Sequence, residues 1–300
     1  MSRRVAGTAV VVLLFGGGAE GCGTGTEGGS VAEEAPEVTP AEAVAKAAEN
    51  TADITSLRYR VTGTLPKTGR LKVEASMSTA PSAMSMEMIA VDRPQAPRTV
   101  VRYVDSTLYV SGSAVDLTKL DGKRWFSAAP AMWGRYSVDN NTYRVLPHQI
   151  EGSPIVQSTI LTGSRHPRKV GTETVDGTRT THYRGTVTVA GLQAARDAAV
   201  DKKSRERQIK SLDQFIGLGL DKALTMDLWI DEDDRAKRFR LRGATYEARF
   251  SADGKPLKPV VGKPLDMTFT LLEINQPVAV KAPSAKETAD LGASADAQAG

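Results

Sequence analysis

The chain has 300 residues, of which 25% are charged, and its formal net charge is +4. So small a positive surplus does not require a nucleic-acid partner, and this length suffices for one large domain or two small ones. The chain contains a single cysteine, Cys22, so an internal disulfide is excluded.

Residues 1–21 show the three-part pattern of a signal peptide. Arg3 and Arg4 precede an apolar run over residues 5–15, which is far shorter than the roughly 20 residues that a membrane-spanning helix needs. Small residues follow, and the sequence Ala19-Glu20-Gly21-Cys22 resembles the lipobox of bacterial lipoproteins. Ala19 and Glu20 depart from the usual pattern of that box.

We expect Cys22 to carry acyl chains such as palmitate and to anchor the protein to the cell membrane, on its extracytoplasmic face. Each buried CH₂ of an acyl chain contributes about 0.8 kcal/mol, and stable anchoring takes more than one chain. The alternative is an ordinary signal peptide that is followed by a stray cysteine.

Composition divides the remainder into three parts. Residues 22–37 are rich in Gly, Thr and Glu, and they predict a flexible tether after the lipidated cysteine. Residues 283–300 are rich in Ala, Ser and Asp, and they predict a loose C-terminal tail. A single folded domain is therefore expected over residues 38–282.

A helix is expected at the start of this domain. Thr39 can cap it, Pro40 suits the first helical position, and Glu42 completes a capping box. A second helix is expected from Ser153-Pro154, where serine and proline form a cap and a first turn.

Residues 191–215 predict the longest helical stretch. Its charged middle, residues 201–207, is expected to divide it in two, and residues 191–221 are interpreted as a lid or a partner surface. The apolar positions assigned to it are Leu192, Ala195, Ala199, Ile209, Leu212 and Ile216.

Alternation of apolar and polar residues predicts strands over most of the domain. Period-two alternation is typical of an antiparallel sheet with one apolar and one solvated face. The fold class is therefore α+β, with one broad antiparallel sheet and a few helices packed on one of its faces. The alternating segments are 57–65, 71–77, 84–90, 181–189, 224–230, 238–242, 246–250 and 265–271, and turns are expected at 80–82, 121–122, 176–177 and 253–254.

Methionines gather on the apolar side of these strands. Methionine is unbranched and polarizable, so it suits an adaptable wall around flexible alkyl chains. It also fills ordinary protein cores, and plain core packing remains the alternative. The six methionines concerned are Met77, Met84, Met86, Met88, Met226 and Met267.

Catalytic and metal-binding patterns are not evident in the sequence. His148, His166 and His182 fall on different segments without metal-ligand spacing, and His182 is expected to make surface hydrogen bonds. No nucleophile elbow, phosphate loop or dinucleotide fingerprint occurs. The acidic residues 231–234 lack the spacing of a calcium loop and predict a solvated turn. We expect no enzymatic activity, no cofactor and no metal.

Two basic groups could meet anionic lipid head groups or could simply keep the surface soluble. The first is a run on the long helical stretch, and the second is a row on the outer face of the sheet. The run consists of Lys202, Lys203, Arg205, Arg207 and Lys210, and the row consists of Arg238, Arg240, Arg242 and Arg249.

Three groups of motifs resemble actinobacterial lipoproteins of the LppX/LprG group. They are turn and strand signatures, and together with Cys22 they extend the resemblance over most of residues 51–283. The motifs are Val175-Asp176-Gly177 with Thr181-His182-Tyr183 and Gly185-Thr186-Val187, then Leu228-Trp229-Ile230-Asp231 with Arg235, and Tyr103-Val104-Asp105 with Leu108-Tyr109-Val110, Gly122-Lys123 and Trp125.

This resemblance implies a LolA-like fold, a curved and incompletely closed antiparallel β-barrel with helices packed on its concave face. It further implies an apolar cavity that binds acylated lipids or glycolipids. From alternation alone, we infer which residues would line it. The predicted wall is Val73, Met77, Met86, Met88, Met226, Leu228, Met267 and Phe269.

The leading hypothesis is a membrane-anchored lipoprotein that binds a lipid or glycolipid and carries it through the cell envelope. We expect a monomer that meets the membrane through its anchor, has an envelope transport partner and binds no nucleic acid. The rival hypothesis is a surface interaction module without a ligand, which assists a partner envelope protein.

Overall fold

The computed structural model describes residues 38–113, 118, 120–128, 146–251, 253 and 255–290. The chain divides into two compact units, 1–37 and 38–300, and all described residues belong to the second. Cys22, the predicted signal peptide and the predicted tether lie outside the described residues.

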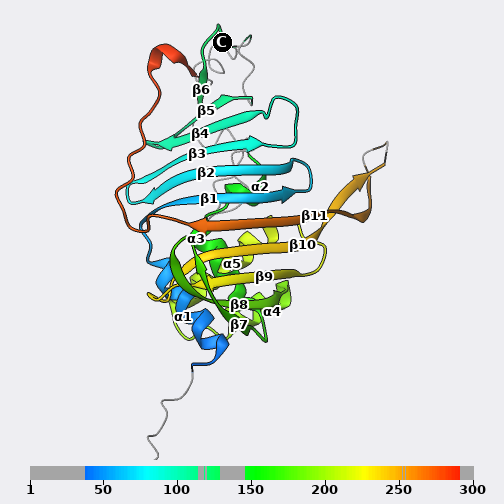
Figure 1. The fold of residues 1–300 in the computed structure, drawn as a ribbon. Helices are drawn as coiled ribbons and strands as arrows, with labels where there is room; N and C mark the ends of the chain where they lie inside the picture. The colour runs from blue at the N-terminus through cyan, green and yellow to red at the C-terminus, as the bar shows by residue number, and fades with distance from the viewer. Residues whose placement is uncertain are drawn as a thin grey trace, which may run out of the picture. The chain divides into compact units, whose positions relative to one another are not determined.

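One sheet of twelve strands dominates the described part (Figure 1). Its spatial order is β12-β6-β5-β4-β3-β2-β1-β11-β10-β9-β8-β7. In chain order the strands are β1 (Ser56–Leu65), β2 (Gly69–Thr79), β3 (Ser82–Ala90), β4 (Arg98–Val104), β5 (Thr107–Gly112), β6 (Trp125–Ala128), β7 (Arg168–Val175), β8 (Thr178–Val187), β9 (Leu224–Ile230), β10 (Ala236–Phe250), β11 (Pro256–Leu271) and β12 (Thr288–Asp290).

The sheet is incompletely closed, because β12 and β7 stand at opposite ends of the strand order. This agrees with the α+β class expected from the sequence. Every neighbouring pair is antiparallel except β12 and β6, which run parallel. The sheet is therefore mixed at one edge, whereas the alternation pattern predicted a purely antiparallel one.

Helices α1, α3, η3, α4 and α5 gather near β7 to β11, whereas α2 lies beside β1 and β2 and η4 precedes β12 at the other edge of the sheet (Figure 1). Helix α1 has the predicted capping box: Glu42 N donates to Thr39 Oγ1, and Thr39 N donates to Glu42 Oε2 at 2.9 Å. The helices are α1 (Pro40–Ala52), α2 (His148–Glu151), α3 (Pro154–Ser158), the 3-10 helix η3 (Thr159–Gly163), α4 (Val189–Asp197), α5 (Lys202–Gly217) and the 3-10 helix η4 (Ala285–Glu287).

The long helical stretch breaks earlier than predicted. Helix α4 ends at Asp197, and Asp201 caps α5 by accepting a hydrogen bond from Ser204 N at 2.8 Å. The charged residues predicted to form the break are therefore the first turns of α5. This new start changes the helical phase, so Ile209 and Ile216, assigned to the apolar side, are 41% and 59% exposed.

Helix α4 rests closely on η3 through two glycines. A Cβ atom on Gly191 would lie 2.1 Å from the carbonyl oxygen of Gly163, so only glycine allows this approach. Both glycines are buried. The contact places α4 over η3, which in turn packs on β8 and β9.

The apolar side chains of the sheet meet the helices in one continuous core. Cross-strand pairing aligns them in rows, as when Val61 of β1 lies opposite both Val73 of β2 and Phe269 of β11. The period-two alternation therefore predicted the buried face of these strands correctly.

The predicted loose tail begins too early. Residues 285–290 form η4 and β12, and Ala289 packs against the core. Before them, the chain crosses the ends of several strands (Figure 1), where Ser56 Oγ donates to Gln276 O at 2.7 Å and Arg102 Nη1 donates to Lys281 O at 3.1 Å. Residues 288–290 are held by backbone pairing with β6 and not by an apolar pattern, so the sequence did not predict this strand.

Candidate functional site

The structure places all eight predicted wall residues on one face of the sheet, in two groups. Val73, Met77, Met86 and Met88 lie on β2 and β3, and Met226, Leu228, Met267 and Phe269 lie on β9 and β11. Strand β1 lies between the two groups, because its Val61 is opposite both Val73 and Phe269. Whether this face binds a ligand remains a prediction.

Met77 of the first group forms a pair with Met84 of β3 beside a small cavity. Met77 lies directly opposite Met84 in the register of β2 and β3, and both are only partly buried. The cavity has a volume of about 80 Å³ and separates this pair from the turn between α2 and α3. Its lining comprises Tyr59, Met77, Ser78, Ser82, Ala83, Met84, Tyr103, Glu151, Gly152, Ser153 and Pro154.

The second group is closely packed. Met226, Met267 and Phe269 have no exposed surface. The Phe269 ring stacks on Phe239 of β10 with 4.6 Å between ring centroids and an interplanar angle of 9°. This part of the face has the dense packing of an ordinary core.

The methionine cavity is too small for a lipid tail in this conformation. Pockets for small molecules commonly have volumes of about 300–1,000 Å³, against about 80 Å³ here. Entry of an acyl chain requires the α2–α3 turn to move away from the sheet. Both helices are short, and neither has a side-chain hydrogen bond at its N-cap, including Ser153, which was predicted to cap α3.

Polar groups behind this turn are incompletely hydrogen-bonded. Gln157 Nε2 of α3 donates to Gln149 O at 3.0 Å and to Gln214 Oε1 of α5 at 3.4 Å. Gln157 Oε1 and Gln214 Nε2 are buried without a hydrogen-bond partner among the described residues. Such groups cost stability, about 1–3 kcal/mol each, so they weaken the hold of α3 on α5.

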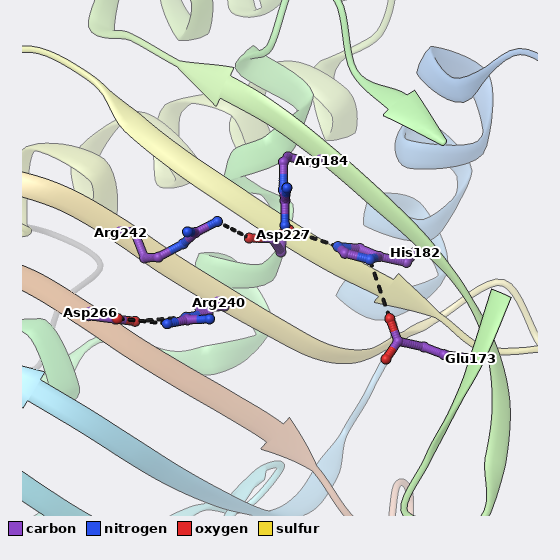
Figure 2. A network of polar contacts seen from close by, with 7 residues as sticks. All are labelled: Glu173, His182, Arg184, Asp227, Arg240, Arg242 and Asp266. Atoms are coloured by element: carbon purple, nitrogen blue, oxygen red, sulfur yellow. Dashed lines mark hydrogen bonds and ion pairs between the residues drawn. The ribbon is translucent and has the colours of Figure 1, made fainter. Parts of the chain in front are cut away.

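The opposite face of the sheet carries a polar network around Asp227 of β9 (Figure 2). The Asp227 side chain is 2% exposed. It accepts hydrogen bonds from Arg184 Nε at 2.6 Å, from His182 Nε2 at 2.7 Å and from Arg242 Nη2 at 2.7 Å. Burial alone would raise the pKa of Asp227, but these three hydrogen bonds outweigh it and hold the pKa below its usual range.

His182 is a buried member of this network, and the prediction of a surface role was wrong. Its ring stacks on Trp229 with 4.3 Å between centroids. Its Nδ1 lies 3.3 Å from Glu173 Oε1, which also accepts a hydrogen bond from Trp229 Nε1 at 2.6 Å. A polar position in a strand can be covered by a neighbouring aromatic ring, which alternation alone does not reveal.

The predicted arginine row is paired within the sheet. Arg240 makes two hydrogen bonds to Asp266, at 2.8 and 2.7 Å (Figure 2), Arg242 binds Asp227, and Arg238 Nε donates to Thr270 Oγ1 at 3.3 Å. The carboxylates compensate these charges, which favours a structural role over contact with membrane phosphates. The side chain of Arg249 lies outside the described residues.

The residues of the Asp227 network drawn in Figure 2 include no serine, threonine, cysteine or lysine. The residues drawn in Figure 2 are carboxylates, guanidinium groups and one imidazole. Within the described parts of the chain, no group of His, Cys, Asp and Glu is arranged to hold a metal ion. Residues 231–234 form the turn between β9 and β10, where Asp231 Oδ1 accepts from Arg235 N at 2.8 Å.

Sequence comparison gives one partial relative among curated proteins. An uncharacterized 31.2 kDa protein of Streptomyces griseus, from the rplA-rplJ intergenic region, is 29% identical over 155 residues. The alignment covers 50% of this chain and 48% of the relative, so the chain spans about half the length of the curated protein it matches. No protein-family model matches the chain.

Solved structures with a similar arrangement include two from mycobacteria. The lipoprotein LppX of Mycobacterium tuberculosis aligns with 81% of this chain and 98% of its own, at 15% identity and a TM-score of 0.45. LprF of Mycobacterium bovis aligns with 82% of this chain and 97% of its own, at 16% identity and a TM-score of 0.47. LppX is a member of the group that the sequence motifs resemble.

Proposed function

We propose that the protein is a membrane-anchored lipoprotein that binds a hydrophobic ligand, a lipid or glycolipid, and carries it through the cell envelope. The observation that carries this proposal is the partly buried Met77–Met84 pair beside a cavity on the core face. Flexible methionine side chains can repack around an incoming alkyl chain at little cost. The proposed activity is binding, without chemistry on the ligand.

Tail binding would be driven by burial of apolar surface, at roughly 25 cal/mol per Å². The α2–α3 turn is the element that would move, since it covers the methionine pair and its helices are short. The closely packed group on β9 and β11 would remain fixed and form the inner end of the site.

The anchor is the second part of the proposal. Cys22 would hold the domain at the membrane through its acyl chains. Among the residues that the structure describes, no helix has the length and apolar character needed to cross a bilayer. Replacing Cys22→Ser should move the protein from the membrane fraction to the soluble fraction, and unchanged partitioning would contradict lipidation.

A second candidate function has its own supporting observation. Strands β10 and β11 extend beyond their neighbours as a two-stranded ribbon (Figure 1) that carries exposed apolar side chains. A ligand-free interaction module could use such a surface to contact a partner envelope protein. The exposed residues are Tyr246, Leu257, Val260 and Val261, of which Val261 is 66% exposed.

Two measurements separate the two candidates. Organic extracts of the purified protein should contain co-purifying lipid, detected by mass spectrometry, if the protein is a carrier. Met77→Trp should fill the cavity and abolish uptake of a fluorescent fatty-acyl probe. Lys72→Trp, an exposed position on the opposite face of β2, is the matched control. A clean extract, with probe uptake equal in both variants, would favour the interaction module.

A further inference from the structure

A second cavity lies among the helices, at a place that the lipid-carrier proposal does not use. It lies between the end of α1, helix α3 and the first turns of α5, and it has a volume of about 210 Å³. Figure 1 shows these helices on the same side of the sheet. The lining residues are Ala52, Ile155, Val156, Thr159, Lys203, Glu206, Arg207 and Lys210.

One wall of this cavity is basic. Lys203, Arg207 and Lys210 recur on one face of α5, and Glu206 is the single carboxylate in the lining, so the lining side chains carry a net charge of +2. Lys203 is paired with Asp53 at 3.0 Å, and Glu206 lies 3.7 Å from Lys202. Among the described residues, Lys210 has no ion pair. The charges of Arg207 and Lys210 therefore dominate this wall.

Arg207 has unused hydrogen-bonding capacity. Its Nη2 donates to Ser204 Oγ at 3.2 Å. Its Nε and Nη1 are buried and have no hydrogen-bond partner in the described structure. A buried donor without a partner costs about 1–3 kcal/mol, and more when it is charged. An anion in the cavity would relieve this cost after a small rotation of the guanidinium.

The opposite wall is apolar. Ile155 is buried and belongs to the core, and Val156 and Ala52 complete this side. A cavity of this volume has room for roughly seven waters at about 30 Å³ each, which suits a phosphate or carboxylate with its first methylene groups. It is smaller than the roughly 300–1,000 Å³ of common ligand pockets, so a whole lipid would not fit.

We propose that this cavity binds the anionic head group of an amphiphile, a phosphate monoester or a carboxylate. Arg207 and Lys210 hold the charge, and the adjoining methylenes lie against Ile155 and Val156. Guanidinium groups bind such oxygens by charge-assisted hydrogen bonds. The basic run on α5 then has a specific role, beyond keeping the helix surface soluble.

The test is a titration of the full-length protein with octyl phosphate, below its critical micelle concentration, by isothermal calorimetry. Arg207→Gln should weaken binding about tenfold, the loss expected for one charge-assisted contact. Arg205→Gln is the matched control, because it makes the same change at an exposed position on the same helix outside the cavity. It should change the affinity by less than about twofold.

Two further ligands identify the chemistry. Inorganic phosphate should bind more weakly than octyl phosphate, since it does not use the apolar wall, and octyl glucoside should show no dependence on Arg207. Equal binding of both phosphates would overturn the amphiphile assignment. Equal losses in Arg207→Gln and Arg205→Gln would show general electrostatic attraction and overturn the site.

Two variants keep the result interpretable. Lys210→Gln alters an exposed side chain of the wall, so it should weaken octyl phosphate binding without affecting the melting temperature. Met77→Trp, which blocks the methionine cavity, should leave octyl phosphate affinity unchanged. Loss of binding in Met77→Trp would place the ligand in the methionine cavity and overturn this inference, whereas failure of acyl-probe uptake alone would affect only the proposed carrier function.

Discussion

The two groups of wall residues share a sheet face and are mostly buried, but only the first has a partly buried member, Met77, beside a cavity. On β9 and β11, Met226, Met267 and Phe269 are fully buried, and the opposite face of these strands carries the Asp227 network. On β2 and β3, Met77 and Met84 are partly buried beside a cavity. One end of the wall is fixed on both faces, and the other can rearrange.

This difference indicates that one part of the sheet would keep the fold while the other part opens for a ligand. A ligand-binding protein must keep its fold while part of its core opens, so the opening part is drawn from the less stable regions. The network on the outer face of β8 to β10 would stabilise the fixed end against that change. If so, substitutions at the β9–β11 end should lower the free energy of unfolding more than substitutions at Met77.

The largest loss in the free energy of unfolding is expected from Asp227→Ala. The change removes the buried carboxylate that accepts hydrogen bonds from Arg184, His182 and Arg242, whose side chains are 36%, 8% and 35% exposed. Hydrogen bonds to charged groups contribute about 1.5–3 kcal/mol each, so losing three of them should cost about 3–5 kcal/mol once solvation of the partly exposed arginines is taken into account. Urea denaturation should show this loss in the free energy of unfolding. A loss below about 1 kcal/mol, the value for exposed pairs, would mean that the network does not hold this end.

The next largest loss of stability is expected from Met226→Ala, and it should exceed the loss from Met77→Ala. Met226→Ala deletes a fully buried side chain and should cost about 2–5 kcal/mol. Met77→Ala deletes a partly buried side chain next to an existing cavity, so we expect less than half that cost. Thermal or urea unfolding of both variants measures the difference. Equal losses would show that the wall is uniformly rigid and would argue against an opening end.

Lowering the pH should destabilise the β9–β11 end of the wall, because it protonates Asp227. Its pKa is lower in the folded protein than in the unfolded chain, where an aspartate has a pKa of about 3.9. Its contribution to stability is therefore complete above that value and is lost as the pH falls toward the folded-state pKa. Urea midpoints measured downward from pH 6 should fall more steeply for the wild type than for Asp227→Asn. Parallel curves would mean that another group governs acid unfolding.

Much of the fold could be predicted because alternation reports burial directly. The strands that carry the methionines have one buried face, as their sequences indicate, and the capping box at Thr39 and Glu42 marks the start of α1. The pairing of β12 with β6 could not be predicted, because residues 288–290 lack a hydrophobic pattern and depend on hydrogen bonds to a distant strand. The break before α5 was misplaced because charge was taken as a helix breaker, although Asp201 is a good N-cap.

The candidate site was harder to predict than the fold. Alternation identified the face that carries the wall, but it could not distinguish tightly packed Met267 from partly buried Met77, since that depends on which helix covers each strand. The Asp227 network depends on register: Arg242 lies opposite Thr225, diagonal to Asp227, and Arg184 lies opposite Asp227. The only available signal was the coincidence of several arginines and one aspartate on polar positions.

The smallest loss of stability is expected from Asp266→Asn, and it tests whether burial of the carboxylate determines how much a pair stabilises the fold. Arg240 and Asp266 are joined by two short hydrogen bonds, yet their side chains are 41% and 42% exposed. Exposed pairs contribute about 0.2–1 kcal/mol, and salt screens them, since the Debye length is about 3 Å at 1 M ionic strength. We therefore expect a loss below about 1 kcal/mol that disappears in 1 M NaCl, while the loss in Asp227→Ala persists because the Asp227 carboxylate is buried. If salt removed both losses equally, solvent would reach the Asp227 network, and the fixed end of the wall would owe its stability to the packing of Met226, Met267 and Phe269 alone.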